Sequence, residues 1–192
     1  TLTGFKYIAE LMGELENNKK FIAAGEESYG YMVGDFVRDK DAVSACAFFS
    51  AMAAAAKDEN QTLYSWLLQM YVDFGFYKEG LVNLTRKGAE GEQQIKAMMA
   101  RFRTNPPLAL GGLKVVTALD YRSRQEKNLT SGAISAIPLP ASDVLQFYCE
   151  DGSKISVRPS GTEPKIKFYI SVKAKLLSKE DFNTMNQQLD TK

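Results

Sequence analysis

The chain has 192 residues, of which 45% are hydrophobic and 24% are charged, and its net charge is +1. These values are typical of a folded globular protein with room for one large domain or two small ones. A charge so near zero argues against a nucleic acid or another polyanion as partner, although a small anion needs only a local cationic pocket. No apolar run reaches the ~18 residues of a membrane span, and the chain opens on a helix pattern without a signal peptide.

The chain contains no histidine. This excludes histidine-based catalytic triads and histidine-containing zinc sites, and leaves proton transfer to carboxylates, lysine or tyrosine. The two cysteines, Cys46 and Cys149, each lie in an apolar run. That placement is typical of reduced core residues and not of a disulfide framework. We therefore expect a cytoplasmic protein.

The first part of the chain has the pattern of a helix-rich α/β region. Thr3 is expected to cap a helix whose apolar stripe runs from Phe5 to Leu15, and Phe21 to Ala24 is expected to form a short buried strand. The loop GEESYG, Gly25 to Gly30, follows this strand. In open α/β sheets, ligands bind in loops at the carboxyl ends of strands.

Two more helices are predicted before the chain changes character. The first spans Asp41 to Lys57 and is rich in alanine, and the second is capped by Thr62. The residues expected to pack from the first helix are Val43, Cys46, Ala47, Phe49 and Ala53. The apolar stripe of the second consists of Leu63, Trp66, Leu67, Met70, Tyr71 and Phe74. The glycine-bounded stretch from Gly75 to Gly80 predicts a boundary, so we place one domain at residues 1–78 and another at 79–192. One strand cannot complete a sheet, so the first domain is predicted to be a partial α/β domain with an incomplete mixed sheet.

Residues 79–192 are predicted to form an α+β domain, an antiparallel sheet with two helices on one face. The expected strands are Leu81 to Thr85, Leu113 to Leu119, Val144 to Cys149, Lys154 to Val157 and Lys165 to Ala174. The expected helices are Glu90 to Arg103, which turns Ile95, Met98, Met99 and Phe102 inward, and a last helix from Ser178, which turns Phe182, Met185 and Leu189 inward. Asp151-Gly152 predicts a hairpin turn, and Arg122 to Ser142 predicts a long surface connection.

Between two of these strands lies RPSGTEP, Arg158 to Pro164. Its two prolines stiffen a loop that can present Arg158, Ser160 and Thr162 together, with the backbone N–H groups around Gly161 directed at an anion. A guanidinium, two hydroxyls and a nest of amides make a phosphate site. The alternative from the residues alone is a hairpin connection that uses glycine and proline for turn chemistry.

The GEESYG loop offers a carboxylate, Glu26, and a hydroxyl, Ser28, between glycines. A carboxylate accepts hydrogen bonds from vicinal hydroxyls and a serine both donates and accepts, so the pair suits a sugar edge. The alternative is an ordinary polar loop between two elements of secondary structure.

Taken together, the stretches RPSGTEPKIKFYI and GEESYG resemble the phosphate-binding loop and the sugar-recognition loop of the α-D-phosphohexomutases, the phosphoglucomutase/phosphomannomutase family. Their order and spacing match the family, and the resemblance runs from about Leu2 to Ile170. The run TGFK, Thr3 to Lys6, looks like the family's short motif before the sugar loop, in the form of the phosphoglucomutase-like branch. The run Asp39-Lys40-Asp41 resembles that branch too, although helix capping explains it equally well.

The resemblance implies a role for each matching residue. The non-transferred phosphate would be held by Arg158, Ser160, Gly161, Thr162 and Lys165, although the alternation of Lys165 with Lys167 also fits a solvated strand face. Sugar hydroxyls would be bound by Glu26 and Ser28, with Lys6 as a further polar contact. The implied activity is that of an intramolecular phosphotransferase, an isomerase of carbohydrate metabolism. It would interconvert hexose 1-phosphate and hexose 6-phosphate, glucose before mannose, through a bisphosphorylated sugar.

Two parts of the family's machinery have no counterpart in this sequence. The family's phosphoryl-carrying serine motif contains a histidine, and its magnesium site is a D-x-D-x-D run; neither pattern occurs here. The resemblance therefore implies the C-terminal part of a longer enzyme, with no catalytic or metal residue in this stretch. Mg²⁺ and glucose 1,6-bisphosphate would serve the full-length enzyme, whose N-terminal domains are the expected partners alongside hexose phosphates. The alternatives are a stand-alone sugar-phosphate-binding module without activity and a structural domain in which both loops are only turns.

Overall fold

The structure is a computed structural model that describes residues 4–16, 18–26, 29–161 and 163–191. It divides into two compact units, residues 1–67 and residues 68–192, and each is described by itself. None of the helices in the described ranges is both long and apolar enough to cross a membrane.

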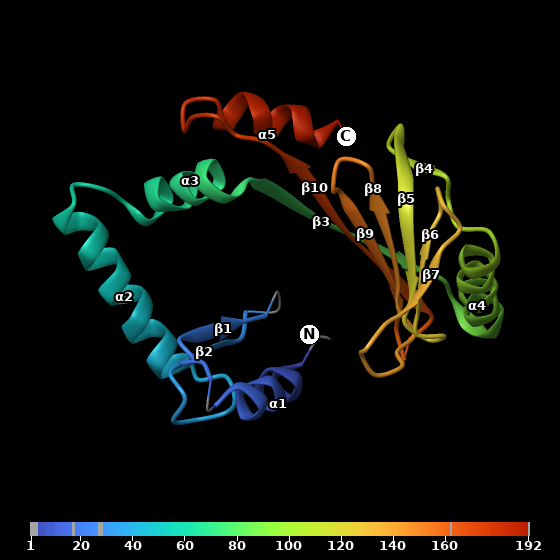
Figure 1. The fold of residues 1–192 in the computed structure, drawn as a ribbon, viewed down its shortest axis with the longest axis horizontal. Coiled ribbons are helices and arrows are strands. Elements are labelled where there is room, and N and C mark those ends of the chain that lie inside the picture. The colour runs from blue at the N-terminus through green and yellow to red at the C-terminus, as the bar shows by residue number, and fades with distance from the viewer. Residues whose placement is uncertain (1–3, 17, 27–28, 162, 192) are drawn as a thin grey trace. The chain divides into compact units, whose positions relative to one another are not determined.

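The first unit contains two helices, a small hairpin and the start of a third helix (Figure 1). Its elements are α1 (Phe5–Leu15), β1 (Ala23–Gly25), β2 (Tyr31–Val33), α2 (Ala42–Asp58) and the first part of α3 (Leu63–Phe74). α1 follows the predicted stripe, with Gly4 at its N-cap position; the predicted cap, Thr3, lies outside the described residues. Phe5 and Met12 of α1 pack with Met32 of β2 in a small core.

The strand predicted at Phe21 to Ala24 begins instead at Ala23, and its predicted burial is wrong. Among the described residues β1 pairs with β2 alone, in an antiparallel hairpin with strands of three residues that the sequence did not predict. A two-stranded hairpin covers little surface, so Ile22 just before it is 73% exposed. The GEESYG loop is therefore the turn of this hairpin.

α2 confirms the predicted helix but not its predicted packing. The helix buries Ala45 and Ala56, whereas Val43 is 80% exposed and Cys46 is also exposed. Ala47, Phe49 and Ala53, the other residues expected to pack, are exposed as well. An alanine-rich helix is apolar on every side, so its sequence does not reveal which face packs. The expectation that Cys46 is a core residue is thus wrong, while the same expectation for Cys149 is confirmed.

The N-cap of α2 explains the acidic run before it. Asp41 accepts hydrogen bonds from the backbone N–H groups of Val43 (3.1 Å) and Ser44 (3.0 Å). Hydrogen bonds from Ser44 and then from the Val43 amide lower the pKa of Asp41 below its ordinary 3.8. Helix capping therefore accounts for this residue without a ligand.

This cap predicts how α2 responds to pH. Because the folded pKa of Asp41 is depressed, its contribution to stability is present above pH 3.8 and is lost as the pH falls through the folded value. We expect the first turn of α2 to fray in acid, and Asp41→Ala to fray it at neutral pH. Amide exchange at Val43 and Ser44 measures this. Asp39→Ala is the control, and equal exchange in both variants would contradict the cap.

The second unit is built on an antiparallel sheet of eight strands among the described residues (Figure 1). The strands are β3 (Phe76–Thr85), β4 (Ala109–Leu110), β5 (Leu113–Asp120), β6 (Gln125–Asn128), β7 (Ile134–Ala136), β8 (Leu145–Cys149), β9 (Lys154–Pro159) and β10 (Lys165–Ala174). Their order is β3-β10-β9-β8-β5-β6-β7, and β4 pairs with β5. The hairpin β6–β7 lies in the segment from Arg122 to Ser142, which is predicted as a long surface connection without strands of its own assigned. That segment is polar because its strands are exposed, and this hid their alternation.

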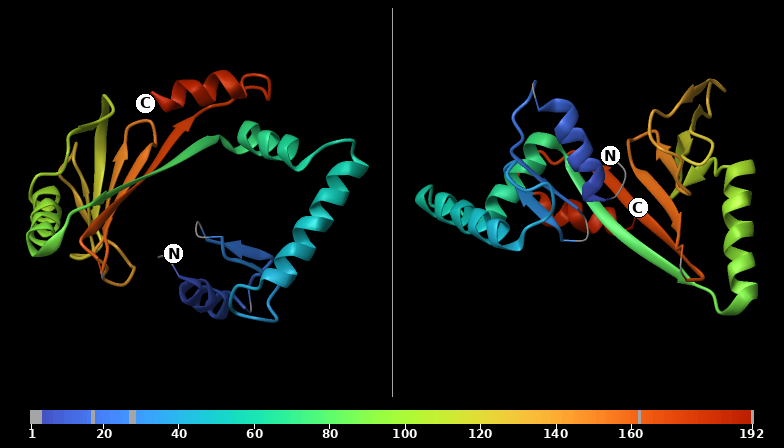
Figure 2. Two further views of the ribbon diagram at one scale, coloured as in Figure 1. Left: turned by 180° about the vertical axis from the view of Figure 1, so that it is seen from behind. Right: turned by 90° about the horizontal axis from the view of Figure 1, so that it is seen from below.

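Both predicted helices of this unit are present, α4 (Gly88–Thr104) and α5 (Phe182–Asp190). α4 lies along one face of the sheet (Figure 2), and its Ile95 and Met99 pack with Val157 and Ile166. α5 packs with Val172 and other residues at the far end of β10. Since Ile166 and Val172 are an even number of positions apart on one strand, both helices contact the same face of β10. This helix face is the core, as the alternation in β10 predicts.

The two units divide elsewhere than at the predicted position. β3 runs unbroken from Phe76 to Thr85 and pairs with β10 over its whole length, so residue 78 lies inside a strand. The units separate between Leu67 and Leu68, because the end of α3 supplies Tyr71 and Val72 to the core around Phe76. Where one domain of the resembled family ends and the next begins stays a prediction.

Candidate functional site

The RPSGTEP stretch forms the tight turn between β9 and β10. The amide of Ser160 donates to the carbonyl of Lys165 (2.7 Å), the amide of Lys165 donates to the carbonyl of Glu163 (2.7 Å), and the amide of Glu163 donates to Ser160 Oγ (3.3 Å). These bonds hold the turn closed without a ligand. Three backbone N–H groups are hydrogen-bonded inside the turn, so fewer of them remain for an anion than the sequence predicts.

Gly161 keeps an approachable backbone. Its amide makes no hydrogen bond to the described residues, and a Cβ at this position would meet nothing within 4 Å. Thr162, also predicted to bind phosphate, lies outside the described residues. Gly161 is exposed and its N–H is not used within the described residues, so this amide can donate to an anion.

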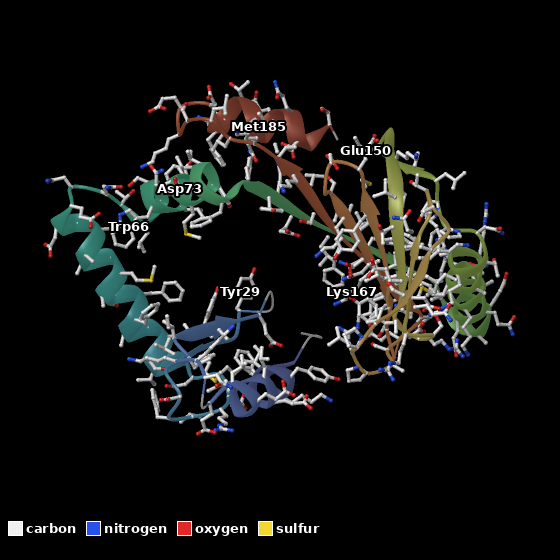
Figure 3. All side chains as sticks on the ribbon, in the orientation of Figure 1. Tyr29, Trp66, Asp73, Glu150, Lys167 and Met185 are labelled. Carbon is white, nitrogen blue, oxygen red and sulfur yellow. The ribbon has the colours of Figure 1, made fainter. Side chains whose placement is uncertain are left out.

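Arg158 stands on the face of the sheet opposite the helices. Its neighbour Val157 is buried in the helix-side core, and alternation turns Arg158 to the other, outer face, where it is exposed. It lies in register with Lys167 of β10, which Figure 3 shows on the side away from α4. Lys165 shares the outer-face parity of Lys167 and pairs with Thr85 of β3. The turn and the adjoining strands thus place three cations together at this end of the sheet.

A cavity of about 420 Å³ lies on the other side of the same turn. Ser160, Gly161, Glu163 and the two prolines form one wall. The remaining lining residues come from α4 and from the two ends of the β6–β7 region, namely Glu92, Ile95, Lys96, Met99, Ala100, Arg103, Arg122 and Asp143. Arg158 is not among them. The turn therefore separates an outer, cationic face from a pocket on the helix face.

Arg103 fixes one side of this pocket. Its side chain is 17% exposed and bonds to Asp120 (3.3 Å) and to Asp143. Burial lowers the pKa of Arg103, but the hydrogen bonds and charges of Asp143 and then of Asp120 outweigh it and raise that pKa. The two aspartates therefore balance the charge of Arg103 in the wall of the pocket. Lys96 is likewise paired with Glu92, one helical turn earlier.

Sequence reasoning missed this pocket. Arg122 follows the end of β5, in the segment predicted as a long surface connection, and Asp143 lies just before β8. No local motif relates either residue to RPSGTEP, because the pairing of β5 with β8 and of β8 with β9 brings them there. Only the order of the strands would have identified these two residues, and no short stretch of sequence reveals that order.

The GEESYG loop forms the turn between β1 and β2. The amide of Glu26 donates to the carbonyl of Gly30 (2.9 Å), and the amide of Tyr29 donates to the carbonyl of Glu26 (3.2 Å). Tyr29 has a φ of 66° and its side chain is 88% exposed at the tip (Figure 3). Ser28, the predicted hydroxyl partner, lies outside the described residues.

Glu26 carries an unusual feature. Its Oε1 atom is buried and has no hydrogen-bond partner among the described residues. A buried, unpaired carboxylate oxygen costs more than 1 kcal/mol, so proteins rarely keep one without a use. An oxygen of this kind can accept from a sugar hydroxyl.

Lys6, the third predicted sugar contact, lies in the first turn of α1 and is exposed. Its Nζ stands 4.8 Å from the centre of the Tyr7 ring. No ion pair or hydrogen bond links Lys6 to Glu26 within the described part of the chain. The structure therefore brings Arg158, Ser160, Gly161 and Lys165 together around one turn, while Lys6 and Glu26 stay separate in their contacts.

A magnesium ion, which the resemblance implies for the longer enzyme, finds no ligand set among the residues that the structure describes. No group of three or more cysteine, aspartate or glutamate side chains gathers to hold a metal among residues 4–16, 18–26, 29–161 and 163–191. The carboxylates of these residues are not grouped as an Mg²⁺ site requires, so metal chemistry is not assigned to them.

Comparison with known proteins identifies the family. A sequence model described as phosphoglucomutase/phosphomannomutase, alpha/beta/alpha domain III, matches residues 1–73. The chain belongs to this family and matches its C-terminal portion.

The relatives that it matches along most of its length are phosphoglucomutases. One from Staphylococcus haemolyticus (strain JCSC1435) is 37% identical over 188 residues, which are 98% of this chain and 33% of the relative. One from Staphylococcus aureus (strain USA300) is 41% identical over 172 residues, 90% of this chain and 31% of the relative. The chain thus spans about a third of the length of these relatives.

A solved structure supports the fold. The exocytosis-sensitive phosphoprotein pp63/parafusin, a phosphoglucomutase from Paramecium in its open form, matches with a TM-score of 0.58 at 20% identity. The match covers 98% of this chain and 32% of that protein. The predicted fold class, a partial α/β domain followed by an α+β domain with an antiparallel sheet and two helices, is confirmed.

Proposed function

We propose that this chain is the C-terminal part of a longer phosphoglucomutase that interconverts glucose 1-phosphate and glucose 6-phosphate, with mannose phosphates as the second choice. The reaction passes through a bisphosphorylated sugar. Residues of this part bind and orient the substrate: the β9–β10 turn holds the phosphate that is not being transferred, and the β1–β2 turn holds the sugar hydroxyls. The names of its relatives support this activity for the longer protein, and the chemistry of the two turns agrees with it.

The observation that carries this proposal is the juxtaposition at the β9–β10 turn. Arg158 and Lys167 stand in register on the outer face, and Gly161, whose amide makes no hydrogen bond to the described residues, lies in the turn that joins their two strands. Cation and amide together suit a phosphate dianion, because charge-assisted hydrogen bonds to it are about twice as strong as neutral ones. Ser160 adds a hydroxyl within the same turn. A site so placed fixes one end of the substrate and leaves the other end to react.

The sugar-binding role of Glu26 rests on its unpaired oxygen. Oε1 is buried without a partner among the described residues, and a vicinal hydroxyl of a hexose supplies the missing donor. Ser28 is proposed as the adjoining contact and Lys6 as a further one. Because a bisphosphorylated sugar must turn over during the reaction, a carboxylate that accepts from hydroxyls of either orientation suits both binding modes.

The exposed apolar side chains of the first unit support the proposal that this chain is part of a longer protein. Val43 is 80% exposed, Ile22 73% and Phe36 71%. A folded domain rarely leaves several large apolar side chains this open without a covering element. The proposal therefore assigns these side chains to the interior of the complete domain, and assigns the phosphoryl-carrying serine and the Mg²⁺ ligands to the rest of the longer enzyme.

The test is a heteronuclear NMR titration of the 192-residue chain with glucose 1-phosphate. Inorganic phosphate and glucose are the controls. We expect both phosphate compounds to shift the amides of Ser160, Gly161 and Lys165, and only the sugar phosphate to shift Glu26 and Tyr29 as well. A folded sample without shifts, at ligand well above about 1 mM where a site worth about 4 kcal/mol would fill, would remove the binding role from this chain.

A further inference from the structure

Tyr29 stands at the tip of the β1–β2 hairpin and is 88% exposed (Figure 3). Its amide donates to the carbonyl of Glu26 (3.2 Å), and the amide of Glu26 donates to the carbonyl of Gly30 (2.9 Å). These two bonds close the turn on either side of the tyrosine. A large aromatic ring is therefore held, open to solvent, in the same tight turn as the buried carboxylate oxygen of Glu26 that lacks a partner among the described residues.

The backbone of Tyr29 adopts a conformation that suits glycine better than tyrosine. Its φ is 66°, and this left-handed region brings the Cβ of an L-residue too close to the following carbonyl oxygen. Hairpin turns commonly place glycine at such a position. The glycine of this turn, Gly30, is used for packing instead, because a Cβ there would come within 2.8 Å of the Phe5 ring. The turn thus keeps a strained, exposed aromatic residue, and strain of this kind clusters at ligand sites.

A hexose has a face that suits an aromatic side chain. The face of an aromatic ring is electrically negative, so it attracts the polarised C–H groups that a pyranose presents in its axial positions. In α-glucose 1-phosphate the phosphate is axial on one side of the sugar ring. The axial positions on the opposite side hold only hydrogen, on C2 and C4. The hydroxyls around the rim of the sugar remain free to donate to a carboxylate such as that of Glu26.

We propose that Tyr29 is a specificity-determining residue that stacks on the hexose face opposite the axial phosphate and thereby selects glucose over mannose. Mannose differs at C2, where its hydroxyl is axial and projects from that same face. This hydroxyl holds the sugar away from the aromatic ring, and it loses water there without gaining a full hydrogen bond. The inference rests on the proposed function, since it requires that the β1–β2 turn binds the sugar. It adds the epimer that the turn prefers and the residue responsible.

The experiment measures the binding of α-glucose 1-phosphate and of α-mannose 1-phosphate to the 192-residue chain by NMR. The sugar protons are followed together with the amides, because protons that lie over an aromatic ring shift upfield. A tyrosine with a merely structural role would not cause that shift. The variants are Tyr29→Phe and Tyr29→Gly. Glycine removes the ring and also adopts the left-handed backbone without strain, so the hairpin is kept while the stacking is lost.

The wild-type chain is expected to bind the glucose phosphate about 2- to 10-fold more tightly than the mannose phosphate, and to shift the protons on C2 and C4 upfield. Tyr29→Phe should keep both effects, because stacking does not need the hydroxyl. Tyr29→Gly should bind the two epimers equally and abolish the upfield shift. Tyr64→Ala is the control and should match the wild-type chain, since Tyr64 is an exposed tyrosine of α3 and belongs to neither turn.

The outcomes separate this inference from the proposed function. If Tyr29→Gly keeps the preference for glucose and the upfield shift, Tyr29 does not stack on the sugar, while shifts at the Glu26 amide leave the proposed function standing. If only the β9–β10 turn responds to glucose 1-phosphate, the sugar-binding role of the β1–β2 turn and this inference both fail, and the phosphate role stands. If neither turn responds, the proposed function fails as well.

Discussion

Ile166→Ala is expected to lower the free energy of unfolding of the second unit by about 2–5 kcal/mol. Ile166 is 0% exposed and packs with Val157, Ile95 and Met99 between the sheet and α4. The substitution removes three carbon atoms from the centre of this core and leaves a cavity that the surrounding strands cannot close. A loss of this size is a large part of the total stability of a domain. The same strand begins directly after the turn that carries the proposed phosphate residues, so its packing also holds that turn in place.

The measurement is urea unfolding followed by the NMR signals of β8, β9 and β10. Tryptophan fluorescence is unsuitable, because the chain has one tryptophan, Trp66, and it belongs to the first unit. Ile134→Ala is the matched control: it removes the same atoms from a side chain that is 61% exposed, and should change stability by less than about 0.5 kcal/mol. Equal losses in the two variants would show that Ile166 does not occupy a packed core.

The success of this sequence in predicting the second unit has a physical reason. Ile166, Phe168, Ile170 and Val172 alternate with polar residues in β10, and alternation of this kind specifies both a strand and the face that it buries. The helix containing Ile95 and Met99 shows the corresponding spacing of three and four. In both elements one face is apolar and the other polar. The pattern therefore identified the core before any pairing of strands was known.

The first unit lacked that contrast. α2 is apolar on nearly all sides, and its exposed Val43 has the same character as its buried Ala45 and Ala56. Three-residue strands such as β2 carry too few positions for a period to be recognised. The hairpin β6–β7 was not predicted for the opposite reason, since its strands are exposed and mostly polar. Burial supplies the signal that sequence reasoning uses, and these elements have little of it.

The candidate site likewise has a part that the sequence predicts and a part that it does not. Residues of the β9–β10 turn are neighbours in the chain, so a short motif contained Arg158, Ser160 and Gly161 together. Strand pairing brings Arg122 and Asp143 to the same turn, and no local sequence pattern indicates this. The buried Oε1 of Glu26 is likewise a property of packing. Local chemistry could be predicted from the sequence, but the pocket around it required the fold.

Arg158→Ala is expected to weaken the binding of glucose 1-phosphate to this chain about 10- to 100-fold, because a charge-assisted hydrogen bond to a phosphate contributes about 1.5–3 kcal/mol. The same substitution in the longer enzyme should raise KM, since the phosphate held here is not the one transferred. Arg158 is exposed on the outer face, so its removal leaves the core of Val157 and Ile166 intact and the fold unchanged.

The size of this effect separates a phosphate ligand from a merely charged strand face. Arg158→Lys keeps the charge but loses the two-pronged geometry of a guanidinium, and should recover only part of the affinity. Arg101→Ala, an exposed arginine elsewhere in the unit, should leave affinity within about twofold. Affinity is measured by calorimetry at two salt concentrations, and far-UV circular dichroism checks the fold. If Arg158→Ala binds as the wild-type chain does, the phosphate lies elsewhere and Arg158 is a solvated residue of β9.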